Sequence, residues 1–92
     1  MEIPSYLESS LDLLPRGEKE KAIKSLMLLE RMEKENRINY RHFAKLIEKN
    51  RYLYKVSMKY RAIVEIDNGK IRILNILHHD KIGLAIYKGL RK

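Results

Sequence analysis

The sequence predicts an α+β domain that spans residues 1–92, in which an N-terminal helical hairpin packs on a small antiparallel sheet. Three observations lead to this prediction. Apolar residues recur at helical spacing in the first part of the chain, the spacing changes to two after residue 50, and an Asn-Gly dipeptide at 68–69 separates two apolar runs. Helices followed by consecutive antiparallel strands indicate a sheet with one covered face and one open face.

Two helices are expected at the N-terminus. Pro4 suits a helix start, because the N–H that it lacks would be unpaired there in any case, and Pro15 ends the first segment. Residues 18–35 form the second helix, whose Glu18 and Glu20 complement the positive end of the helix dipole. We expect its apolar stripe to face the core; the stripe consists of Ala22, Ile23, Leu26, Met27, Leu29 and Met32, and Leu28 broadens it.

A third, shorter helix is expected over residues 38–50. Asn39 is placed to cap its N-terminus, and Ile38 and Phe43 have the spacing of a hydrophobic staple. Phe43, Leu46 and Ile47 would then face the core, and Asn50 would end the helix. This segment would connect the helical hairpin to the sheet.

Three strands of a β-meander are expected to follow, at residues 51–58, 60–66 and 71–79. Lys55 and Arg61 fall on positions whose side chains point away from the helices. The last strand is apolar on both faces, which predicts a central position in the sheet. A short C-terminal helix is expected over residues 80–90, with Asp80 as its N-cap.

The composition narrows the class of protein. The chain has no cysteine, which excludes a disulfide-stapled secreted domain and a cysteine-based zinc site. Its N-terminus lacks the cationic region and apolar run of a signal peptide. No apolar run approaches the roughly 20 residues needed to span a bilayer. We therefore expect a cytoplasmic protein with no membrane partner.

The positive charge is concentrated in the sheet half of the chain. Residues 1–50 hold ten Lys/Arg and nine Asp/Glu, a net charge of +1, whereas residues 51–92 hold ten Lys/Arg and three Asp/Glu, a net charge of +7. Such an asymmetry favours a polyanionic partner, either a nucleic acid or an acidic protein segment.

The same half resembles a known family. Its segments LYK at 53–55, YRAIV at 60–64, DNG at 67–69 and HH at 78–79 are similar to the strands, hairpin turn and final basic segment of the RelE/ParE superfamily of toxin–antitoxin pairs. The upstream helices, with LLP at 13–15, are similar to the helical hairpin of that family. The resemblance covers most of the chain and implies a RelE-like fold.

Ribosome-dependent members of this superfamily cut messenger RNA without a metal ion, using basic residues on the concave face of the sheet. Carried over by position, the resemblance implies phosphate-binding roles for Lys55 and Arg61. It places His78 and His79 in the final basic segment, with Lys81 as an additional cation. No metal and no small-molecule cofactor are expected.

Cleavage by 2′-OH attack needs a base with a near-neutral pKa, a cation for the phosphorane and an acid for the 5′-oxygen. Arg61 is expected to contact the scissile phosphate, Lys55 to hold the flanking backbone, and one of His78 and His79 to transfer a proton. Adjacent histidines on a regular strand point to opposite faces, so at most one of them would share the face of Arg61.

Structural alternatives exist for these residues. Arg61 could form an ion pair with Glu65, and one histidine could be a packed residue. Lys59 and Tyr60 complete the expected RNA-binding set, although lysines on open strands also deter aggregation and Tyr60 could pack rather than stack on a base.

The expected function is therefore that of a toxin of a type II toxin–antitoxin pair, a ribosome-dependent mRNA endonuclease. Its expected partners are the ribosome, mRNA and an acidic antitoxin segment. Ser57 and Gly83 stand where many family members have a basic and an aromatic residue. This departure keeps open a non-catalytic or gyrase-directed toxin that binds a protein, and a generic RNA-binding module is a third alternative.

Overall fold

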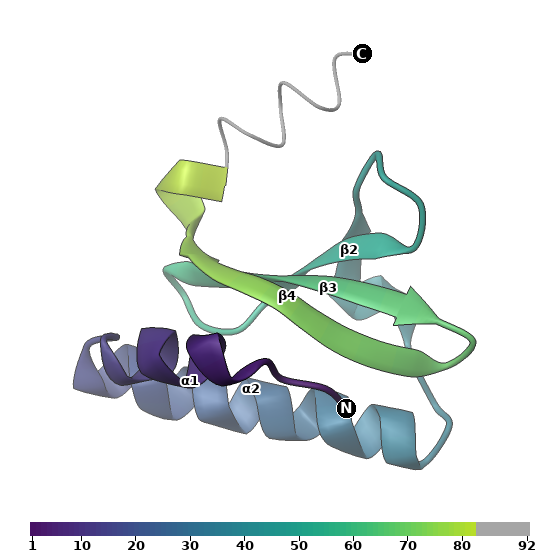
Figure 1. Ribbon diagram of the computed structural model, residues 1–92, viewed down its shortest axis with the longest axis horizontal. Helices are drawn as coiled ribbons and strands as arrows, with labels where there is room; N and C mark the ends of the chain where they lie inside the picture. Colours follow the sequence, from purple (N-terminus) through teal and green to yellow (C-terminus); the bar gives the residue numbers. More distant parts are fainter. Residues whose placement is uncertain (83–92) are drawn as a thin grey trace.

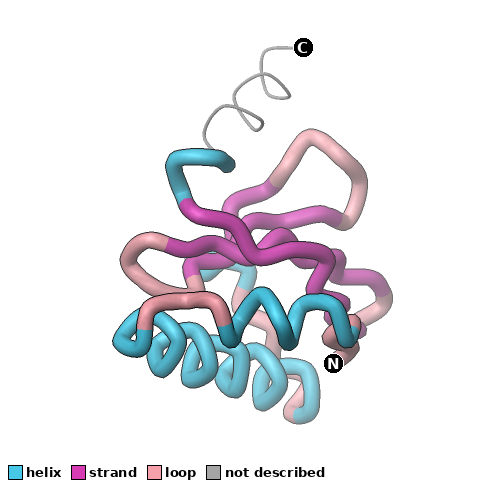
Figure 2. Tube along the Cα trace, turned by 60° about the vertical axis from the view of Figure 1, so that its left-hand side comes forward, coloured by secondary structure: helices cyan, strands magenta, loops and turns pink. Residues whose placement is uncertain are grey.

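Two helices lie against one face of a four-stranded antiparallel sheet in the computed structural model, which describes residues 1–82 (Figure 1). Figure 2 shows the same two layers from a second direction. The α+β fold is confirmed. Its elements are α1 (Ser5–Asp12), α2 (Arg16–Lys34), the 3₁₀ turn η1 (Tyr40–His42), β1 (Phe43–Lys45), β2 (Arg51–Lys55), β3 (Tyr60–Asp67) and β4 (Lys70–His78).

Both predicted N-terminal helices are confirmed, and each follows a proline. Pro4 and Pro15 are in extended conformation directly before α1 and α2. Part of the predicted stripe on α2 faces the core: Ala22, Leu26 and Leu29 are buried and Met32 packs against them. Ile23, Met27 and Leu28, in contrast, are exposed. Within residues 1–82, neither helix combines the length and the apolar character needed to span a bilayer.

The core lies between the helices and the covered face of the sheet. Its largest fully buried side chains are Leu7, Leu29, Val56, Val64, Ile71 and Ile73. Full burial of a side chain of this kind contributes about 1.5–3 kcal/mol. Because these residues come from both layers, their packing holds the helical hairpin to the strands.

The predicted third helix is wrong. Asn39 does cap a turn, since its side chain accepts a hydrogen bond from the Arg41 backbone N–H at 3.0 Å, but that turn is η1 and ends at His42. The chain then enters β1, which pairs antiparallel with β2. Phe43 packs there among the rings of Tyr52 and Tyr54. Strand pairing with β2 overrides the helical spacing, and the sheet has four strands rather than three.

The prediction that the last strand is central is also wrong. The strand order is β1-β2-β3-β4, so β4 lies at the edge of the sheet. Its outer edge is nevertheless covered. Glu2 forms a parallel bridge with Arg72, and the Glu33 carboxylate accepts the backbone N–H of Ile71. These contacts explain how a strand that is apolar on both faces is accommodated at an edge.

A bulge in β4 changes which side chains face the helices. Ile63 pairs with Asn75, but the next residue, Val64, pairs with Ile73, so Leu74 is an extra residue. The Leu74 carbonyl accepts a hydrogen bond from the Tyr6 hydroxyl at 2.8 Å. Side chains on the two sides of Leu74 therefore do not follow one continuous alternation between the two faces of the sheet.

The predicted hairpin between the last two strands is confirmed. Asn68 and Gly69 have φ angles of 50° and 77°, as a two-residue type I′ turn requires. Beyond β4, residues 79–82 form a helical turn on the side of the sheet away from α1 and α2 (Figures 1 and 2). The rest of the expected C-terminal helix, including Gly83, lies outside the described residues.

Candidate functional site

The candidate residues gather at the end of the sheet where β2 passes into β3 and β4 ends. Lys55 pairs with Arg61 across β2 and β3, and Tyr60 pairs with His78 across β3 and β4. The backbone N–H of His79 donates to the Lys59 carbonyl at 2.7 Å. Strand pairing thus brings these residues to one end of the sheet, with Lys55 and Arg61 on its open face and the Tyr60–His78 pair on the face of Ala62 and Ile76, which the helices cover.

Arg61 is tied to the backbone of the turn between β2 and β3. Its Nη1 donates to the carbonyls of Ser57, Met58 and Tyr60 at 2.9, 3.2 and 3.0 Å. The alternative ion pair with Glu65 is replaced by an ion pair between Glu65 and Arg72. A guanidinium has five N–H donors, so Nε and Nη2 remain for other partners. A catalytic role for Arg61 stays a prediction.

Like charges face each other on the open side of the sheet. Lys55 and Arg61 are directly opposite, an arrangement that is unfavourable unless an anion compensates it. Elsewhere on the same face, Arg72 has carboxylate neighbours in Glu65 and Glu2. Within residues 1–82, no ion pair of this kind joins a carboxylate to Lys55 or Arg61, and this end of the face therefore favours an anionic ligand.

The other expected RNA-binding residues surround this end. Lys59 is exposed in the turn before β3, and Lys81 is exposed in the helical turn after β4. Tyr60 is half-buried, and its ring lies edge-on to that of His78, with centroids 5.3 Å apart. Tyr60 thus positions His78 in the structure, while stacking on a base stays a prediction.

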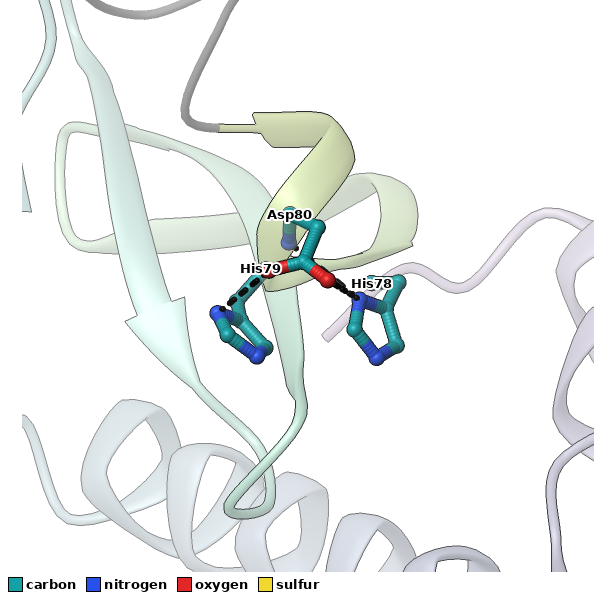
Figure 3. Close-up of side chains that lie close together, drawn as sticks. All are labelled: His78, His79 and Asp80. Atoms are coloured by element: carbon teal, nitrogen blue, oxygen red, sulfur yellow. Dashed lines mark hydrogen bonds and ion pairs between the residues drawn. The ribbon is translucent and has the colours of Figure 1, made fainter.

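His78 and His79 converge, contrary to the divergence expected for a regular strand. The strand ends at His78 and the backbone turns into a helical conformation at residue 79, so the alternation stops between them. Their rings stack with centroids 4.7 Å apart. The Asp80 carboxylate lies beside both imidazoles, with its oxygens 3.6 Å from Nδ1 of His78 and 3.3 Å from Nδ1 of His79 (Figure 3).

The sequence analysis missed Asp80 as a partner of the histidines, because its position suggested only an N-cap. It also missed Lys21 and Lys24 of α2. Together with Lys55 they line an open groove of about 400 Å³ beside the end of β2. The spacing of Lys21 and Lys24 on a helix is typical of any solvated face, so only the packing of α2 against the sheet indicates their place.

Glu18 is the acidic group of α2 that approaches this region. The nearby Ser57 hydroxyl and, to a smaller extent, the Lys59 backbone N–H lower the pKa of Glu18 below its ordinary value, against a contribution from desolvation. Glu18 thus lies beside the turn between β2 and β3, close to Ser57 and Lys59. His42, in contrast, lies before β1, at the opposite edge of the sheet from β4.

Comparison with known proteins found no match: no family model, no curated protein and no solved structure matches this chain. The resemblance to the RelE/ParE superfamily therefore remains an expectation.

Proposed function

We propose that this protein is a RelE-like toxin that cleaves messenger RNA on the ribosome by 2′-OH attack. The main supporting observation is the pair of adjacent imidazoles, His78 and His79, held beside one carboxylate at an end of the sheet that is rich in cations. Two histidines provide the two proton transfers that the reaction requires at neutral pH.

His79 is the proposed general base. Its Nδ1 lies 3.3 Å from Asp80 Oδ1, and the negative charge favours a proton on Nδ1, which leaves Nε2 free to accept one. His79 is half exposed, so a ribose can reach Nε2. In the proposed step, Nε2 takes the 2′-OH proton while the 2′-oxygen attacks phosphorus.

His78 is the proposed general acid. In its neutral form, Nδ1 of His78 accepts the Asp80 backbone N–H at 3.2 Å and the proton is on Nε2. For the acid step His78 takes up a second proton on Nδ1, beside the Asp80 carboxylate at 3.6 Å. As the bond from phosphorus to the 5′-oxygen breaks, this imidazolium gives its Nε2 proton to the 5′-oxygen and returns to the neutral form. The products are a 2′,3′-cyclic phosphate and a free 5′-hydroxyl.

The charge that develops on the phosphorane requires cations. Lys55, Lys59 and Lys81 are exposed around the site, and Arg61 has Nε and Nη2 donors beyond those bound to its own turn. The unfavourable pairing of Lys55 with Arg61 is compensated when a phosphate binds between them.

An acidic antitoxin segment is the proposed protein partner, and the cytoplasm is the proposed location. The +7 charge of residues 51–92 attracts an acidic segment and steers its encounter. An antitoxin that covers the cations would block the RNA site directly.

The test uses purified full chain, programmed ribosomes and a labelled message, with a chelator present. We expect discrete cuts that end in a 2′,3′-cyclic phosphate. Replacing His78→Asn or His79→Asn should lower the cleavage rate by about 10²–10⁴-fold, the usual contribution of general acid–base catalysis. A 2′-deoxy substitution at the cut site should abolish cleavage.

His42→Asn is the matched control, because His42 lies at the opposite edge of the sheet. This variant should cut at the wild-type rate. An intact message with wild-type protein, or equal rates for the His78, His79 and His42 variants, would refute the proposed mechanism.

One observation favours the second candidate, a gyrase-directed or otherwise non-catalytic toxin that binds a protein. Ile23, Met27 and Leu28 are 41%, 65% and 53% exposed on α2, which leaves an apolar surface on the helix. Inhibition of DNA supercoiling by purified gyrase, with no RNA cleavage, would support this candidate over the first.

A further inference from the structure

The His78, His79 and Asp80 side chains form a set of metal-ligating groups. One ligating atom of each residue lies within 4.8 Å of the others. Two imidazole nitrogens and a carboxylate oxygen are ligands that suit zinc and neighbouring divalent transition metals. The sequence did not suggest this site, because adjacent histidines on a regular strand would diverge.

The spacing of these atoms fits coordination better than direct hydrogen bonding. The two distances from imidazole Nδ1 to carboxylate oxygen, 3.6 and 3.3 Å, exceed the usual range of an N–H···O hydrogen bond. Ligands of a tetrahedral zinc ion, at bond lengths of about 2.0–2.1 Å, lie about 3.4 Å apart. Figure 3 shows the carboxylate between the two rings, so all three groups border one small space.

Nδ1 of His78 has one lone pair, which accepts the Asp80 backbone N–H at 3.2 Å, so a metal ion at that nitrogen would replace this hydrogen bond. Asp80 is 75% exposed and His79 is 47% exposed, so a metal ion can enter from solvent.

Two further contacts hold the ligands in place. The ring of Tyr60 lies edge-on against His78, and the backbone of His79 is bonded to the Lys59 carbonyl. Supporting contacts of this kind restrict the ligand orientations before a metal arrives.

We propose that His78, His79 and Asp80 bind one divalent transition metal ion of the zinc type, with the remaining coordination positions filled by water. Binding does not depend on the proposed nuclease activity. If that activity is present, the metal withdraws both imidazoles from proton transfer and acts as a reversible inhibitor, and this consequence rests on the proposed function.

The experiment titrates the untagged full chain with Zn²⁺ alone, in competition with a chromophoric chelator and without RNA. We expect one equivalent to bind. Each of His78→Ala, His79→Ala and Asp80→Asn should weaken binding by at least about tenfold, since even supporting residues around metal ligands contribute 10–100-fold. His42→Ala should bind as the wild type does, and Mg²⁺, which prefers oxygen ligands, should not compete.

A second measurement needs no variant. Zn²⁺ should shift the NMR signals of the His78 and His79 rings and leave those of His42 unchanged. The proposal is overturned if wild-type protein binds no Zn²⁺, if the three ligand variants lose no more affinity than His42→Ala, or if the His42 ring responds instead. Both measurements are made without RNA, so their failure would not refute the proposed RNA cleavage, which is tested separately.

Discussion

At the scale of single residues, strand pairing and local backbone geometry decide what each cation and histidine does. Arg61 has the position expected for phosphate binding, yet its Nη1 is bonded to three carbonyls of the preceding turn. Lys55, its cross-strand neighbour, is exposed. The positive charge of Arg61 therefore has a structural role in the turn, whereas the positive charge of Lys55 is available to a ligand.

Arg61→Ala is expected to lower the free energy of unfolding by about 1–3 kcal/mol, because three carbonyls lose a charged donor. Urea unfolding provides the measurement. Lys55→Ala, the matched control on the opposite strand, should change stability by no more than about 0.5 kcal/mol. Equal effects of the two substitutions would show that the turn does not need the guanidinium.

At the scale of secondary-structure elements, the turns and the edge of β4 define the register of the sheet. The tight turn between β3 and β4 needs positive φ at both Asn68 and Gly69. The outer edge of β4 is held by Glu2 and Glu33, whose backbone and side chain respectively bond to it. These two features place the end of β4, and with it the histidines.

A single chemical change, glycine to alanine, should have opposite effects at two positions. Gly69→Ala should lower the free energy of unfolding by about 1 kcal/mol, because alanine rarely adopts the positive φ of this position. A steric clash does not contribute, since an added Cβ would lie at an ordinary 3.6 Å from Asn36 Oδ1. Gly17→Ala, in the first turn of α2 with open space around it, should stabilise by about 0.5 kcal/mol. Thermal unfolding of both variants checks the signs, and destabilisation at both positions would contradict this account.

Glu33 should make stability depend on pH. Desolvation alone would raise its pKa, but the N-terminal ammonium and the Ile71 backbone N–H outweigh it and lower the pKa below the ordinary 4.5. A lowered pKa in the folded state means that the stabilisation is present above that ordinary value and is lost as the pH falls through the folded pKa.

Glu33→Gln removes the charge but keeps a hydrogen-bond acceptor. We expect the variant to be about 1–2 kcal/mol less stable than wild type at pH 7, and the difference to shrink as the pH falls toward 3. Urea unfolding across this pH range measures it. Glu30→Gln, at an exposed position of the same helix, should have nearly the same free energy of unfolding as wild type at every pH.

At the scale of the whole molecule, charge is distributed unevenly between the layers. The chain carries +8 overall, and residues 51–92 account for +7 of it. Lys55, Lys59 and Lys81 lie at one end of the sheet, and Lys21 and Lys24 extend this positive region onto α2. A surface of this kind binds a polyanion through released counterions, so its affinity depends on salt.

Replacing Lys55, Lys59 and Lys81 together by glutamine should weaken binding to single-stranded RNA. It should also reduce the slope of log affinity against log salt by about 2, since each phosphate contact contributes about 0.7. Fluorescence anisotropy at several salt concentrations measures the slope. A control that replaces the exposed Lys34, Lys49 and Lys70 has the same net charge and should keep a steeper slope. Equal slopes would argue against a defined RNA surface.

Periodicity, prolines and turn residues act over a few neighbouring positions, so the amino-acid sequence was enough to predict the two N-terminal helices, the β2–β4 meander and the Asn68–Gly69 turn. It also indicated that Lys55, His78 and His79 belong to the candidate site. Three outcomes required the folded chain: residues 43–45 form a strand, β4 lies at an edge with a bulge at Leu74, and the histidines converge on Asp80. Those outcomes depend on partners that are distant in the chain, and local spacing contains no information about them.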